Sequence, residues 1–147
     1  MIGGGCSGTP QFLPPVAAIE EAGAAAISAA ARLAANAAAG REFEQAGLKA
    51  LNAAKNTTTI NVPGIATGSI PDVLNAGLTE FKSAVEINNS LQLRIQTAYA
   101  SLTGQPLNLV VGPATERVSQ SLQQAIASTG GTIQRFNPAT GIFTPFP

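Results

Sequence analysis

The sequence predicts an α/β (α+β) fold in which a mixed central sheet is flanked by helices and preceded by an alanine-rich helix. Two observations predict this class. An alanine-dominated stretch covers residues 16–39, and short β-rich runs alternate with helical patterns from residue 57 onward. Such alternation favours a mixed sheet with helices packed on it. With 147 residues, 45% of them hydrophobic, the chain can build one core but not two full-sized domains.

The first part of the chain, residues 1–39, differs in composition from the rest. Residues 1–15 are rich in glycine and proline and are predicted to form an arm. Residues 16–39 are predicted to form a helix, because alanine is the best helix former. A transmembrane helix needs about 20 predominantly apolar residues, and Arg32 interrupts this marginally apolar stretch. We therefore expect a packing or connecting helix, with no stable membrane insertion, and a boundary before residue 40.

The next segment, from residue 40 to residue 85, is predicted to contain one helix and three strands. Phe43, Ala46 and Leu51 recur at helical spacing, while the β-rich runs that follow are separated by proline and glycine. A turn at residues 75–77 joins the last two strands into a hairpin. The predicted helix and strands cover residues 41–55, 57–62, 70–74 and 78–85.

The last part of the chain is predicted to alternate helix and strand twice. The apolar run Leu107–Val111 is typical of a strand that is covered on both faces. The helix before it carries its apolar face on Leu91, Ile95, Ala98, Tyr99 and Leu102. The predicted elements are helix 87–102, strand 107–111, helix 115–128, strand 132–136, turn 137–141 and a short end at 142–146.

The composition excludes several kinds of active site. The chain contains no histidine, which removes histidine-based nucleophile systems, ribonuclease mechanisms and zinc sites. One cysteine excludes an internal disulfide and a cysteine-rich metal site. Carboxylates that bind a hard cation such as Mg²⁺ are the natural remaining chemistry. The eight acids and eight bases cancel, so nucleic-acid binding would need a local basic cleft or a partner.

One constellation fits that chemistry. Asp72 follows Pro71, and Glu80 and Lys82 are two residues apart on a predicted strand, so their side chains share a face. The hairpin would bring Asp72 beside them. Two carboxylates beside an ammonium are suited to metal-assisted phosphodiester hydrolysis. The spacing alone is weak evidence, because chance gives about 0.16 acid-x-Lys matches in such a chain. The alternative is a surface ion pair on an edge strand.

The chain also resembles a known family. The resemblance lies in the segments Gly40–Glu44, Ala53–Thr57, Ile70–Leu74, Glu80–Lys82, Gln92–Arg94, Gly130–Ile133 and Phe136–Gly141. They are similar to the restriction-endonuclease-fold, PD-(D/E)xK nuclease domains at the C-termini of bacterial polymorphic toxins, including Rhs-type and contact-dependent inhibition proteins. The resemblance covers about residues 40–147.

The resemblance implies roles for individual residues. Asp72 and Glu80 would be metal ligands for Mg²⁺ or Mn²⁺, and Lys82 would be the catalytic lysine. Glu44 would be the first-helix acid that completes the catalytic and metal-binding site. The alternative for Glu44 is a helix-surface acid that pairs with Lys49 or Lys55.

Three residues of the helix 87–102 would contact the substrate: Gln92, Arg94 and Gln96. Gln92 and Gln96 lie on one helical stripe with Tyr99. Some members of the family have a Gln-x-x-x-Tyr spacing, which this chain does not reproduce. Arg94 lies on another face, where a solvated arginine is the alternative.

The resemblance further implies a delivered toxin nuclease. The substrate would be DNA by preference, with tRNA as the alternative within the same fold. A cognate immunity protein would neutralise the domain, and residues 1–39 would be the end of the delivery region of a larger parent chain. A secretion-system effector would carry the domain into a competitor, where it would act in the cytoplasm. Two other readings are a housekeeping nuclease and a non-enzymatic structural or membrane-interacting segment of a secreted protein.

Overall fold

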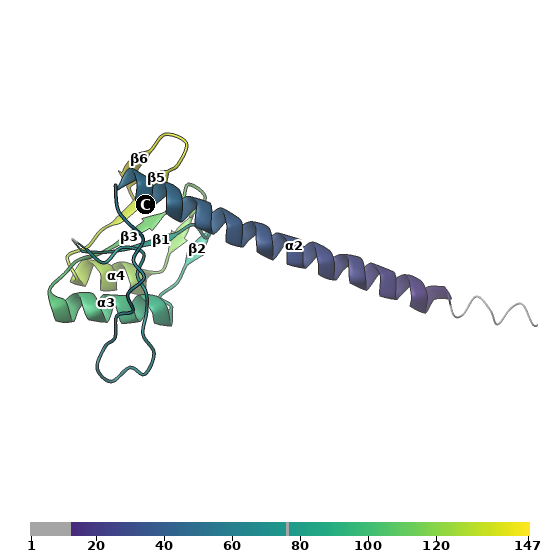
Figure 1. Cartoon of the computed structure of the whole chain (residues 1–147), viewed down its shortest axis with the longest axis horizontal. Helices are drawn as coiled ribbons and strands as arrows, with labels where there is room; N and C mark the ends of the chain where they lie inside the picture. Colours follow the sequence, from purple (N-terminus) through teal and green to yellow (C-terminus); the bar gives the residue numbers. More distant parts are fainter. Residues whose placement is uncertain (1–12, 76) are drawn as a thin grey trace, which may run out of the picture. The chain divides into compact units, whose positions relative to one another are not determined.

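The computed structural model describes residues 13–75 and 77–147 (Figure 1). Contacts divide the chain into two compact units, Met1–Ala39 and Gly40–Pro147, and each is described by itself. In the described part of the first unit the chain is helical from Leu13 onward. The predicted arm at residues 1–15 therefore ends earlier than expected, because proline is tolerated in the first turn of a helix; residues 1–12 of that arm lie outside the described residues. Within the described ranges no helix is both long and apolar enough to cross a membrane.

The two helices predicted at residues 16–39 and 41–55 are a single helix, α2 (Leu13–Ala50). Gly40 does not interrupt it, since a helical glycine costs only about 1 kcal/mol relative to alanine and helix formers surround it. The helix also ends five residues earlier than predicted. Asn52 adopts a φ of 52°, a left-handed conformation that stops a helix, and the amide of Ala53 donates to the carbonyl of Leu48 at 2.9 Å.

The second unit is built on a four-stranded mixed sheet, which confirms the predicted fold class. The strand order is β1-β3-β5-β6, where β1 (Leu78–Lys82), β3 (Leu107–Val111) and β5 (Ile133–Asn137) are parallel and β6 (Ile142–Pro145) is antiparallel to β5. Helix α3 (Leu91–Thr103) connects β1 to β3, and α4 (Gln120–Ser128) connects β3 to β5. A parallel neighbour requires such a crossover. Because β1 stands at one end of this strand order, it is an edge strand.

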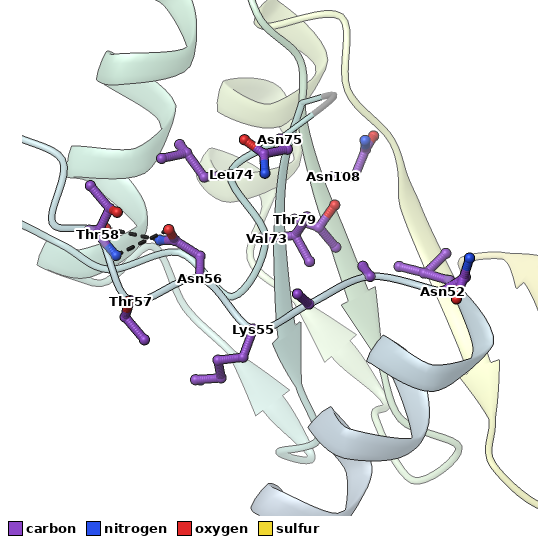
Figure 2. Close-up of a pocket in the computed structure, with 13 residues that line it drawn as sticks. Asn52, Lys55, Asn56, Thr57, Thr58, Val73, Leu74, Asn75, Thr79 and Asn108 are labelled. Carbon is purple, nitrogen blue, oxygen red and sulfur yellow. Dashed lines mark hydrogen bonds between the residues drawn. The ribbon is translucent and has the colours of Figure 1, made fainter.

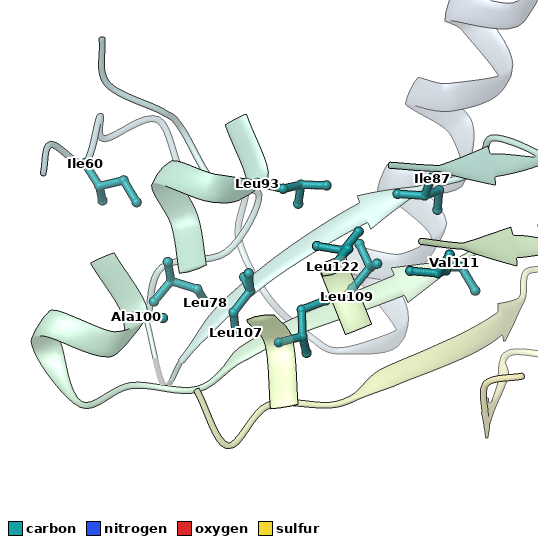
Figure 3. Close-up of a cluster of buried hydrophobic side chains, with 11 residues drawn as sticks. Ile60, Leu78, Ile87, Leu93, Ala100, Leu107, Leu109, Val111 and Leu122 are labelled. Atoms are coloured by element: carbon teal, nitrogen blue, oxygen red, sulfur yellow. The ribbon is translucent and has the colours of Figure 1, made fainter. Parts of the chain in front are cut away.

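Helices cover both faces of this sheet. On one face α3 and α4 lie side by side (Figure 1), and apolar side chains of β1 and β3 pack against them (Figure 3). On the other face the end of α2 packs through Phe43 and Leu48 against Phe81, Val110 and Phe136. Side chains alternate between the two clusters along β1, as the pleat of a strand requires. Glu80 and Lys82 therefore project toward the α3 face.

Two of the predicted strands do not form. Residues 57–62 and 70–74 contribute only isolated bridges, Ile60 with Ser69 and Val73 with Thr79. The threonine run at 57–59 is exposed, and Pro71 lacks the amide that a ladder needs. The expected hairpin is therefore a single bridge; its turn at 75–77 includes residue 76, which lies outside the described residues. A small parallel pair, β2 (Glu86–Ile87) with β4 (Arg117–Val118), was not predicted.

The two later helices begin after their predicted starts at residues 87 and 115. Ser90 caps α3 by accepting from the amide of Leu93, and Ser119 caps α4 in the same way. The apolar face predicted for α3 is partly wrong, because Leu91 and Leu102 are exposed. The helix instead turns Leu93, Ile95, Gln96, Thr97 and Ala100 inward. A polar side chain thus faces the sheet where Glu80 projects.

Candidate active site

Asp72 and Glu80 meet at the edge of the sheet. The segment that carries Asp72 runs beside β1 and is fixed to it by the bridge between Val73 and Thr79. The backbone amide of Asp72 donates to Glu80 Oε1 at 3.2 Å, and the amide of Phe81 donates to Asp72 Oδ2 at 2.8 Å. Both residues are buried, with exposed fractions of 6% for Asp72 and 3% for Glu80. The backbone therefore holds the two carboxylates together without a full hairpin.

Two glutamines of α3 bind the Glu80 carboxylate. Gln92 Nε2 donates to Glu80 Oε2 at 2.8 Å, and Gln96 Nε2 donates to Oε1 at 3.2 Å. Gln96 also donates to Ser69 at 3.1 Å and is fully buried. The predicted substrate contact does not fit Gln96, because its side chain is fully buried. The one-turn spacing of the two glutamines places both on the carboxylate.

Lys82 completes this group. Its Nζ donates to Gln92 Oε1 at 2.9 Å and lies 3.6 Å from Glu80 Oε2. The side chain is about one-third exposed, at 32%, so the ammonium can meet both the buried carboxylate and solvent. The structure thus brings together Asp72, Glu80 and Lys82, which the sequence singled out.

Lys55 is a member of the cluster that sequence reasoning did not identify. Its Nζ donates to Asp72 Oδ1 at 3.1 Å and also pairs with Glu44. The alternative for Glu44, pairing with a lysine, is therefore present, and the same lysine also contacts Asp72; the role of Glu44 as a metal-binding acid stays a prediction. Lys55 lies in one of the segments that resemble the family. The helix was predicted to include it but ends at Ala50, and the path of the chain after the helix directs the Lys55 side chain to Asp72.

Arg94 and Tyr99 lie outside the cluster. Arg94 is exposed on α3, and no side-chain hydrogen bond or ion pair of the described residues joins it to the acids. Tyr99 is half-buried and packs against the core between α3, α4 and the sheet. Arg94 remains a candidate for solvent or phosphate contact from the rim.

Burial and neighbouring charges shift the pKa values of two groups in the site. Burial, reinforced by the charge of Asp72, raises the pKa of Glu80 to about 7, against the opposing effects of Lys82 and of its hydrogen bonds. For Lys55, burial lowers the pKa, but the bonds with Glu44 and Asp72 outweigh it and the net pKa lies above 10.5. The site brings together three acids, Glu44, Asp72 and Glu80, and two lysines, Lys55 and Lys82.

The chemistry and remaining acceptor positions of the acids bear on whether they could hold a hard divalent cation. Across residues 13–75 and 77–147, no group of three or more histidine, cysteine, aspartate or glutamate side chains could hold a metal. Mg²⁺, however, commonly takes one or two protein carboxylates, with water and substrate phosphate as its other ligands. A carboxylate offers about four acceptor positions, and Asp72 and Glu80 accept two and three hydrogen bonds respectively. Each therefore keeps capacity for a cation.

A groove of about 640 Å³ adjoins the cluster (Figure 2). Residues 51–58 form one wall, residues 73–75 form another, and Thr79 and Asn108 contribute from the sheet. These last two are register partners on β1 and β3. The lining is mostly amides, hydroxyls and small apolar groups, and Lys55 belongs to it. Lys55 therefore links the groove to the acids.

Comparison with known proteins identifies the family of the chain. A family model described as "Restriction endonuclease fold toxin 7" matches residues 40–122. The matched span includes Glu44, Lys55, Asp72, Glu80 and Lys82. No curated protein and no solved structure gives a significant match. The family model covers more than half of the 147 residues, and the chain belongs to the family of restriction endonuclease fold toxins that it describes.

Proposed function

We propose that residues 40–147 are a toxin nuclease domain that hydrolyses phosphodiester bonds with a divalent cation. The observation that carries the proposal is the convergence of Asp72, Glu80 and Lys82 at an edge strand, in a chain of a restriction endonuclease fold toxin family. Residues 1–39 would then belong to the delivery region of a larger parent chain.

Asp72 and Glu80 would hold Mg²⁺ or Mn²⁺, with Glu44 as a third acid nearby. When bound, the cation supplies Lewis-acid polarisation of the phosphoryl group. Gln92 and Gln96 orient the Glu80 carboxylate, which must be ionised to serve. A cation beside Glu80 favours that ionised form, since an opposite charge lowers a carboxyl pKa.

Lys82 would act on the substrate side of the site. Gln92 Oε1 accepts from its Nζ, which fixes the ammonium beside Glu80 and leaves further protons for a phosphate oxygen or an attacking water. In this position Lys82 counters the charge that develops on the phosphoryl group and orients the water. Gln92 would position Lys82 as well as Glu80, and Arg94 would contact the nucleic-acid backbone from the rim.

DNA is the proposed substrate, with tRNA as the alternative within the same fold. The toxin family also supports delivery into a competitor cell by a secretion-system effector, action in its cytoplasm, and a cognate immunity protein that protects the producer. The chain has no net charge, and the immunity protein is proposed to cover the site around Lys82 and Lys55.

A cleavage assay tests the proposal. The purified chain is incubated with plasmid DNA and with total tRNA, in Mg²⁺ or in EDTA, beside Lys82→Met and the control Lys49→Met. Lys49 is an exposed lysine at the end of α2. We expect cleavage of DNA in Mg²⁺, its loss in EDTA and in Lys82→Met, and full activity in Lys49→Met. Absence of metal-dependent cleavage of either polymer, or equal cleavage by Lys82→Met, would refute the mechanism.

A further inference from the structure

The ammonium of Lys55 lies between two carboxylates of the candidate site. It donates to Asp72 Oδ1 at 3.1 Å and pairs with Glu44 on its other side. Asp72 is buried, so this charge reaches an acid that solvent does not. A positive charge that bridges two acids satisfies the electrostatic need that a metal cation would also satisfy. Lys55 therefore competes with any cation that binds Asp72.

The main chain fixes this approach. The amide of Asn56 donates to the carbonyl of Asp72 at 2.8 Å, and Asn56 Nδ2 donates to the carbonyl of Pro71 at 3.0 Å. The residue next to Lys55 is thus tied to the backbone of Asp72. The Lys55 side chain itself is half exposed, at 50%, and carries a flexible four-carbon stem. Its root is anchored, while its ammonium can change partners.

The second possible partner of Lys55 lies in the groove. Lys55 is the charged member among the described residues that line it, and the other polar lining groups are neutral amides and hydroxyls (Figure 2). Amides and hydroxyls can contact sugar, phosphate and base edges, but only a cationic side chain also neutralises the charge of a phosphodiester. Among the described lining residues, Lys55 carries such a charge.

We propose that Lys55 exchanges between these two positions. Without metal it occupies the carboxylates of Glu44 and Asp72. When a divalent cation takes Asp72, the ammonium turns to a backbone phosphate of a nucleic-acid strand in the groove. The substrate contact rests on the proposed function, whereas the competition for Asp72 does not. Lys55 should therefore weaken the binding of the cation and strengthen the binding of the substrate, two effects of opposite sign.

Calorimetric titration with Mn²⁺ tests the competition on the full chain. A neighbouring positive charge lowers a carboxyl pKa by about one to three units, and we expect a comparable effect on cation binding. Lys55→Met should therefore bind Mn²⁺ about tenfold or more tightly than the wild type. Lys55→Arg keeps the charge and should resemble the wild type, as should Lys49→Met. Circular dichroism checks folding, and Lys55→Gln provides a second neutral side chain. Unchanged or weaker Mn²⁺ affinity in a folded neutral variant overturns the competition.

The salt dependence of oligonucleotide binding tests the substrate contact. Binding is measured with Mn²⁺ in the Lys82→Met protein, with and without Lys55→Met. Loss of one phosphate contact should weaken binding and reduce the slope of log affinity against log salt by about 0.7 to 0.9. An unchanged slope, in a protein whose wild type cleaves nucleic acid, overturns this contact alone. A wild type that neither binds nor cleaves overturns it together with the proposed function.

Discussion

In the metal-free protein, the stability of Glu80→Gln relative to the wild type should increase as the pH rises. A carboxyl whose pKa rises from 4.5 to about 7 on folding costs about 3 kcal/mol once it is ionised, because each pKa unit corresponds to about 1.36 kcal/mol. Below pH 4.5 the group is protonated in both states and costs nothing. Between pH 4.5 and 7 only the unfolded chain releases the proton, so the free energy of unfolding falls; above pH 7 the cost is constant.

Urea denaturation in EDTA measures this effect, with circular dichroism as the signal. The wild type and Glu80→Gln are compared at pH 4.5, 6 and 8. The amide also disturbs the bonds from Gln92 and Gln96, but that cost changes little with pH. The difference between the two proteins should therefore move in favour of Glu80→Gln by about 3 kcal/mol from pH 4.5 to pH 8. A difference that is the same at all three pH values would refute the reasoning.

Three further predictions concern the site and its support. Gln96→Leu removes a buried donor from Glu80 and should lower the free energy of unfolding by about 1 to 3 kcal/mol and slow cleavage; exposed Gln124→Leu is the control for both denaturation and rate. Gly131→Ala would place a Cβ against the carbonyl of Leu107 and should cost about 1 to 3 kcal/mol, so unchanged urea denaturation would contradict it. Arg135→Met removes a donor to three loop carbonyls and should cost about 2 kcal/mol; retained thermal stability would count against that role.

The sequence predicted the fold class but not the boundaries of several elements. The strand Leu107–Val111 was predicted residue for residue, because burial on both faces leaves a nearly continuous apolar run. The ends of α2 were not, since they depend on whether neighbouring residues tolerate Gly40 and on the left-handed conformation of Asn52. Local helix propensity does not determine whether the helix continues through Gly40 or which conformation Asn52 adopts.

The site shows the same division between local and tertiary information. Glu80 and Lys82 share a face in any strand, so their pairing follows from spacing alone. The approach of Asp72 was expected from a hairpin, yet a bridge and side-chain bonds to β1 achieve it. Lys55 depends on the path of the chain after α2, and Gln96 on the rotation of α3 against the sheet. Both are decided by packing between elements far apart in the sequence.

The charge pattern connects the stability of this protein with its proposed chemistry. Only 11% of the residues are charged, yet folding gathers Glu44, Asp72, Glu80, Lys55 and Lys82 at one sheet edge. Burial, together with repulsion by Asp72, raises the pKa of Glu80 and destabilises the metal-free fold, and the repulsion between the two carboxylates would favour cation binding. Glu80→Gln should thus gain relative stability at pH 8 and lose Mn²⁺ affinity together. If Glu80→Gln gained relative stability at pH 8 but kept its Mn²⁺ affinity, Glu80 would not be a ligand of the cation.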